Sequence, residues 1–276
     1  MMKNSSILII MTTVLFLSSC ATNVFTGKKT LKPIANDRLF PMAFSQYDQF
    51  LDENNVITDT PEARMITTVG GKIKTAAQRW LNAIGHPEYL DGYEWEYKLV
   101  KDDQVNAWCM PGGKIVFYTG ILPICQDETG VAIVMGHEVA HALANHGGQR
   151  MSAAQWQAII GTGVAVGSQV AGASNETQQL IGQAYGLGSQ VGGMLPFSRA
   201  HETEADKIGL YLAAIAGYNP DEGAELWKRM KAKSGGQAPP EFLSTHPSND
   251  SRIENLKDLA PKAKAEAAKY GVTSFK

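Results

Sequence analysis

A five-residue motif near the middle of the chain constrains its fold more than any other feature. His137, Glu138 and His141 belong to the run His-Glu-Val-Ala-His, which on a helix places two imidazoles one turn apart on the same face. Both rings can then bind one metal ion, and the carboxylate beside the first can reach a water molecule at the ion's open position. An acidic start at Asp127 and the Gly-Gly stop after His146 predict a helix over residues 127–146.

Zinc catalysis needs three protein ligands and one open position, so a third donor must come from elsewhere. Glu202 is the predicted third ligand because it lies in a second helical segment and Asp206 follows on the same face. The carboxylate of Asp206 could accept the free N–H of a ligand histidine. Glu204 points about 200° away from Glu202 round this helix and is predicted to be solvated. His146 falls on the helix face opposite His137 and is also predicted to lie outside the site.

Apolar periodicity predicts a mainly helical α+β domain over residues 39–276 with a small antiparallel sheet. The predicted helices cover residues 61–84, 127–146, 199–216, 222–233 and the chain from about 250. The predicted strands cover residues 93–99, 105–109 and 114–118, and a turn at Pro111-Gly112-Gly113 joins the last two into a hairpin. A Gly- and Ala-rich insertion at residues 153–195 is expected to pack on the domain or to cover the site as a lid.

The N-terminus has the pattern of an export signal over residues 1–19. Lys3 precedes an apolar core, Ile7 to Leu17, that is too short to span a bilayer. The run Leu-Ser-Ser-Cys that ends at Cys20 resembles the lipobox of bacterial lipoproteins, which implies acylation of Cys20; an ordinary signal peptide with a chance cysteine is the alternative. Residues 20–38 would then form a tether. By the same resemblance, the protein is expected in the periplasm, anchored in the outer membrane.

The motif helix, the Ser198 to Asp206 segment and Thr245-His246-Pro247 upstream of Arg252 resemble one family. They are similar to the gluzincin metallopeptidases that include the HtpX heat-shock protease, the CAAX prenyl endopeptidase and BepA. Asn106-Ala107 and the glycine hairpin resemble the family's active-site edge strand. Because the sequence shows neither the membrane helices of HtpX nor the helical repeats of BepA, it is expected to belong to a soluble, single-domain lipoprotein branch.

This resemblance implies a zincin-like fold with one zinc ion held by His137, His141 and Glu202, and Glu138 as general base. The oxyanion formed during peptide hydrolysis needs a further donor, and His246 and Arg252 are the candidates by chemistry and by family pattern. A turn histidine and a surface salt bridge are the alternatives for these two residues.

The sequence therefore predicts a zinc metalloendopeptidase that acts on unfolded or misassembled envelope proteins. Such chains could add as a strand beside the hairpin between Cys109 and Tyr118. A formal net charge of −2 does not suggest nucleic acid as a partner. The alternatives are a chaperone or assembly factor that binds chains in the zinc cleft, and an amidase acting on cell-wall peptides. Whether Cys109 and Cys125 form a disulfide is left open.

Overall fold

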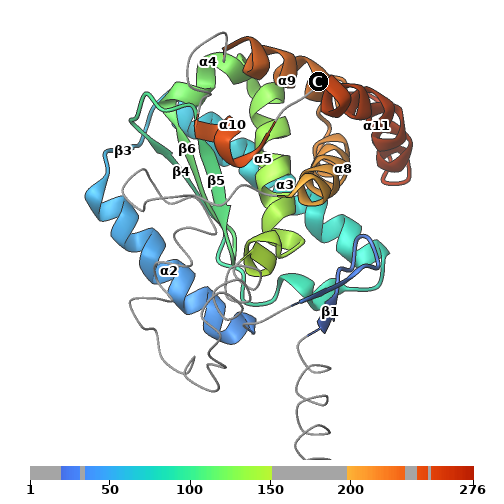
Figure 1. The fold of residues 1–276 in the computed structure, drawn as a ribbon, viewed down its shortest axis with the longest axis horizontal. Coiled ribbons are helices and arrows are strands. Elements are labelled where there is room, and N and C mark those ends of the chain that lie inside the picture. The colour runs from blue at the N-terminus through green and yellow to red at the C-terminus, as the bar shows by residue number, and fades with distance from the viewer. Residues whose placement is uncertain (1–19, 32–34, 151–197, 234–240, 248–249) are drawn as a thin grey trace, which may run out of the picture.

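The computed structural model describes residues 20–31, 35–150, 198–233, 241–247 and 250–276 (Figure 1). The predicted signal peptide and the insertion at 153–195 lie outside the described residues. Within the described ranges, no helix combines the length and the apolar character needed to cross a membrane. The predicted fold class, mainly helical α+β, is confirmed.

The central sheet holds β3 (Val56–Ile57), β4 (Glu96–Val100), β5 (Ala107–Met110) and β6 (Lys114–Tyr118) in the order β3-β4-β6-β5. The prediction of an antiparallel sheet is wrong for one pair, because β4 runs parallel to β6. The predicted hairpin of β5 and β6 is confirmed, and its turn needs the left-handed φ of 82° and 88° at Gly112 and Gly113. In this order β5 lies at the end of the sheet, next to α5.

The two faces of the sheet are covered by different helices (Figure 1). α2 (Asn36–Glu53) was not predicted as a helix and packs through Leu39, Phe40, Ala43 and Tyr47 on one face. α3 (Pro61–Ala83) and α5 (Glu128–Leu143) cover the other face and form the larger core with it. The metal-binding motif therefore lies on a helix that is packed directly against the sheet.

Capping side chains fix where the main helices begin. Thr60 accepts a hydrogen bond from the N–H of Ala63 at the start of α3, and Asp127 accepts from Thr129 and Gly130 at the start of α5. Ser198 accepts from the N–H of His201 at the start of α8 (Arg199–Ile215). α9 (Glu222–Lys233) has its predicted bounds. The remaining elements are η1 (Pro87–Leu90), η2 (Thr119–Ile121), α4 (Leu122–Cys125), α10 (Glu241–Thr245) and α11 (Asp250–Ala268).

The helix that carries the motif is shorter than predicted. α5 ends at Leu143, and Asn145 takes a left-handed φ of 54°, a conformation that asparagine tolerates better than most residues. A new helical segment then begins at His146. The chain direction therefore changes between His141 and His146, which rules out the single helix over 127–146.

α5 and α8 approach each other closely because glycines meet at their contact. A Cβ atom on Gly136 would lie 2.6 Å from the carbonyl oxygen of Gly209, and one on Gly209 would lie 2.7 Å from the backbone nitrogen of His137. Neither helix could carry a side chain there. This contact brings α8 next to the motif.

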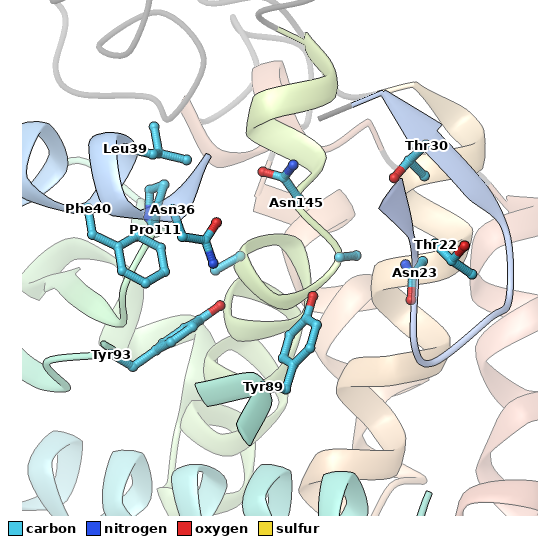
Figure 2. A pocket seen from close by; sticks show the side chains of 12 residues that line it. Thr22, Asn23, Thr30, Asn36, Leu39, Phe40, Tyr89, Tyr93, Pro111 and Asn145 are labelled. Atoms are coloured by element: carbon cyan, nitrogen blue, oxygen red, sulfur yellow. The ribbon is translucent and has the colours of Figure 1, made fainter. Parts of the chain in front are cut away.

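Residues 20–31, predicted as part of a tether, form a hairpin of β1 (Cys20–Thr22) and β2 (Lys29–Leu31). The ring of Phe25 packs edge-on against Trp80 at a centroid distance of 4.9 Å. A cavity of about 70 Å³ separates the hairpin from α2, with Asn145 between them (Figure 2). Acylation of Cys20 stays a prediction.

Candidate metal centre

Four side chains from separate parts of the chain converge on one buried point. His137 and His141 come from α5, Glu202 from α8 and His246 from the residue after α10. One donor atom of each lies within 4.8 Å of the others, and each residue is only 3% or 4% exposed. Such a group of imidazoles and a carboxylate could hold a metal ion.

The donor atoms face one another closely. Nε2 of His141 lies 3.1 Å from Nε2 of His137 and 3.4 Å from Oε1 of Glu202. Nδ1 of His246 lies 3.2 Å from Nε2 of His137 and 3.1 Å from Oε1 of Glu202. The structure thus brings together the three predicted ligands, and the role of each as a ligand stays a prediction.

Glu138 lies beside this group and is 3% exposed. Its Oε1 is 3.5 Å from Nε2 of His246, and this buried oxygen makes no hydrogen bond with the described residues. Burial raises the pKa of Glu138, although the neighbouring His246 and His137 oppose that effect. A carboxylate with a raised pKa beside a metal group is suited to accept and return a proton.

Asp206 lies where the sequence pattern predicted it, four residues after Glu202 on α8. Its Oδ1 is 3.0 Å from Nδ1 of His137, so the ring of His137 has Nε2 towards the donor group and Nδ1 towards a carboxylate. Burial alone would lower the pKa of His137, but hydrogen bonds to Asp206 and Glu202 outweigh burial and raise it to about 9.

Arg252 on α11 joins the two carboxylates of α8. Its Nε and Nη2 donate to Asp206 at 2.8 and 2.7 Å, and its Nη1 lies 2.6 Å from Oε2 of Glu202. Nη1 also donates to the carbonyl of Pro247, and the guanidinium lies 3.5 Å from the ring centroid of Trp227. These contacts show a guanidinium that holds the site's carboxylates, and the oxyanion role predicted for Arg252 stays a prediction.

His246 reaches the centre because α10 is anchored beside the sheet. The N–H of Phe242 donates to the carbonyl of Val105, just before β5, and the ring of His246 stacks on Phe242 at 4.5 Å. Its position makes it a fourth possible donor of the group, whereas the sequence predicts His246 at the site only as a candidate for stabilising the oxyanion. Its predicted part in stabilising the oxyanion stays a prediction.

Two residues predicted to lie outside the site, His146 at the end of the motif helix and Glu204 as a solvated charge, are buried at the site. His146 is 0% exposed and Glu204 is 7% exposed. Nδ1 of His146 lies 3.0 Å from Nδ1 of His141, and its Nε2 lies 3.2 Å from Oε2 of Glu204. Burial lowers the pKa of His146, although the hydrogen bond to Glu204 opposes that effect. Both interpretations are corrected by the turn at Asn145, which directs the ring of His146 back to His141.

The two thiols that could have paired are both free. Cys109 and Cys125 are buried and unbonded to each other, and burial raises the pKa of each. No disulfide between them supports the fold.

The comparisons with known proteins agree with this geometry. A family model described as Peptidase family M48 matches residues 70–260. The chain belongs to this family. The match includes all four residues of the donor group and Glu138, and the predicted class of enzyme, a metallopeptidase, is the class of the M48 family. The finer prediction, a soluble lipoprotein branch of M48, stays a prediction.

Curated relatives of this M48 chain are proteases by name. "Mitochondrial metalloendopeptidase OMA1" of Saccharomyces cerevisiae is 38% identical over 181 residues, which are 63% of this chain and 49% of that protein. The protein of the same name in Arabidopsis thaliana is 33% identical over 220 residues, 80% of this chain and 39% of its own. The "Beta-barrel assembly-enhancing protease" of Escherichia coli is 26% identical over 167 residues, 60% and 34% of the two chains. The chain thus spans half or less of the length of these relatives.

The predicted location is corrected by the same comparisons. The relatives from yeast and Arabidopsis thaliana are mitochondrial by name, which contradicts a periplasmic protein at a bacterial outer membrane. The outer membrane as a partner loses its support with that location.

Proposed function

We propose that this M48 protein is a zinc-dependent endopeptidase that hydrolyses peptide bonds of unfolded polypeptides. The observation that carries the proposal is the buried convergence of His137, His141, Glu202 and His246, with the carboxylate of Glu138 directly beside them. Imidazole nitrogens with one carboxylate oxygen are a ligand set suited to zinc, whereas magnesium and calcium prefer oxygen ligands alone.

The residues of the centre also fit an ion that leaves one position open. Glu138 has a buried oxygen without a hydrogen bond to the described residues, and an ion with a water molecule would satisfy it. His137, His141 and Glu202 would hold the ion, and His246 offers a fourth donor that substrate or water could replace. A bound zinc ion supplies a Lewis acid that polarises the scissile carbonyl and acidifies water.

The protein's own groups then carry the proton transfers. Glu138 accepts the proton of the attacking water molecule and returns it to the leaving amine, as its raised pKa favours. Asp206 keeps the proton of His137 on Nδ1, so Nε2 stays available for the ion. His246, whose Nε2 faces Glu138, is placed to donate to the developing oxyanion when it is not bound to the ion.

The position of β5 supports an extended, unfolded chain as substrate. Among the strands of the described residues, β5 stands at one end of the sheet and packs beside α5, so a peptide added along it would lie next to the motif. Backbone hydrogen bonds to an edge strand read little sequence, which predicts broad specificity. Because the predicted location is corrected, nothing restricts the proposed substrates to envelope proteins.

Denatured casein as substrate tests the proposal. Purified zinc-loaded protein should degrade it, a chelator should stop the reaction and added zinc should restore it. Glu138→Gln should keep bound zinc and lose activity by about 100- to 10,000-fold, because the base that moves the proton is missing. Glu225→Gln, on the exposed side of α9, is the matched control and should keep full activity. If Glu138→Gln digests casein at the wild-type rate, the protein is not an endopeptidase of this mechanism.

A further inference from the structure

A second line of buried polar side chains continues outward from the metal centre. Nδ1 of His141 meets Nδ1 of His146 at 3.0 Å, and Nε2 of His146 meets Oε2 of Glu204 at 3.2 Å. The other oxygen of Glu204 accepts a hydrogen bond of 3.1 Å from the side-chain amide of Asn23. Asn23 is 5% exposed, Glu204 7% and His146 0%. Polar groups this deeply buried are costly unless they are paired, so the line is a specific arrangement.

Three separate segments of the chain build this line. His146 opens the helical segment after the turn at Asn145. Glu204 projects from α8 on the side away from Glu202. Asn23 lies in the turn of the β1–β2 hairpin, across the end of α5 from α2 (Figure 2). Their meeting next to His141 therefore depends on the tertiary fold and not on local spacing.

One arrangement of protons satisfies the whole line when an ion is bound. An ion held by Nε2 of His141 occupies that lone pair, so the proton of this ring must lie on Nδ1. His141 then donates to Nδ1 of His146, which places the proton of His146 on Nε2. His146 in turn donates to the carboxylate of Glu204. Each nitrogen and oxygen thus has a defined role as donor or acceptor.

We propose that His146 and Glu204 form a relay that fixes the tautomer and ring orientation of His141 for metal binding. The inference rests on the zinc site proposed above. His146 is a positioning residue in this scheme, because it contacts the ligand and neither the ion nor the substrate. Three carboxylates of α8 then act at the centre: Glu202 faces the ion, Asp206 orients His137 and Glu204 orients His141 through His146.

Neighbouring contacts keep the relay in place. The ring of His201 stacks on that of His146 with a centroid distance of 4.5 Å and an angle of 19° between the planes. Nε2 of His201 is itself 3.2 Å from Oε1 of Gln149, in the helical segment that His146 begins. The stack fixes the plane of the His146 ring. The ring must keep this plane because its two nitrogens form hydrogen bonds to partners on opposite sides.

The test measures zinc affinity by competition with a chromogenic chelator, and the visible absorption bands of the cobalt-substituted protein. His146→Phe keeps the ring stacked on His201 and removes both nitrogens. It should raise the dissociation constant for zinc about 10- to 100-fold and shift the cobalt bands. His146→Gln, which keeps a donor and an acceptor, should stay within about threefold of wild type. His86→Phe, in the loop before η1, is the matched control and should bind zinc as wild type does.

A double variant separates a relay from independent contacts. Glu204→Gln alone should weaken zinc binding, but added to His146→Phe it should weaken it no further, because the line is already broken. If the two effects multiply, or if His146→Phe lowers thermal stability while the zinc affinity and cobalt bands stay unchanged, the relay is refuted. If His146→Phe fails to fold, the Glu204→Gln variant alone tests the proposal. A dissociation constant for zinc within about twofold of wild type in that variant overturns the relay. Wild-type protein that binds no zinc would instead refute the proposed function and the relay with it.

Discussion

Arg252 neutralises the two buried carboxylates that α8 brings to the metal centre. It is 6% exposed and pairs through separate nitrogens with Asp206 and Glu202. These ion pairs raise the pKa of Arg252 against the effect of burial. A planar guanidinium can serve two carboxylates at fixed angles, which an ammonium group cannot.

We therefore predict that Arg252→Lys lowers the free energy of unfolding of the zinc-free protein by about 3 kcal/mol. One carboxylate would lose its partner while remaining buried. Urea denaturation measures the change, and Arg38→Lys on the exposed side of α2 should stay within about 0.5 kcal/mol of wild type. Equal stability of the two variants would show that the carboxylates do not need the guanidinium.

Spacing inside one helix predicts four residues of the centre, and the family pattern adds His246 and Arg252. His137, His141, Glu202 and Asp206 could be found because pairs four residues apart share a helix face. His146 and Glu204 could not, because their contact depends on the left-handed backbone of Asn145. An asparagine followed two residues later by Gly147-Gly148 was the available signal that the motif helix ends early.

The crossing of α5 and α8 is the contact between elements that assembles the site. Gly136 precedes the first motif histidine, and Gly209 lies two turns after Glu202 on α8. With backbones in direct contact at this point, the carboxylates of α8 can reach the rings of α5. A wider separation would move Glu202 away from His137.

Gly209→Ala should therefore lower the free energy of unfolding by about 2–3 kcal/mol and weaken zinc binding. The added carbon would lie 2.7 Å from the nitrogen of His137, against backbone that cannot move aside. Gly71→Ala on α3 is the control, because a Cβ there meets nothing within 4 Å, and it should gain about 0.5–1 kcal/mol. Thermal melting of both variants measures the difference, and an unchanged Gly209→Ala protein would contradict the close packing.

The order of the strands shows where prediction from pattern stops. The glycine turn was sufficient to pair β5 with β6, but nothing in the alternation of β4 indicates that it adds beside β6 in parallel. α2 was missed for a related reason: its buried residues Leu39, Phe40, Ala43 and Tyr47 follow a polar stretch that was interpreted as a tether. Both features depend on which elements pack beside the strands and on the faces of the sheet. The pattern of a single segment does not show these neighbours.

At the scale of the whole molecule, Glu128 ties together distant parts of the chain. It lies in the first turn of α5 and accepts hydrogen bonds from Lys72 on α3, from Tyr218 after α8 and from Lys276. The hydrogen bonds from Lys276 and Tyr218 are the main causes that lower its pKa to about 2. The stabilising contribution of this carboxylate is present above its unfolded pKa near 4.5 and is lost as the pH falls towards 2.

Glu128→Gln should therefore flatten the stability profile in acid. Between pH 4.5 and 2 the wild type should lose about 1 kcal/mol more than the variant, since water screens these partly exposed pairs. Denaturation by urea across this pH range measures the difference. Glu62→Gln, in the exposed first turn of α3, removes a carboxylate without these partners and should follow the wild-type curve. If the stability of Glu128→Gln also follows the wild-type curve, the hydrogen bonds to Glu128 do not stabilise the fold.

The distance along the chain between His137 and His246, 109 residues, has a consequence for biosynthesis. At ordinary translation speeds the motif helix leaves the ribosome roughly 5–20 s before α10 does. Until then a growing chain holds only part of its donor group and lacks Arg252 on α11. The complete group of His137, His141, Glu202 and His246 can therefore assemble only after synthesis of the chain has passed α10.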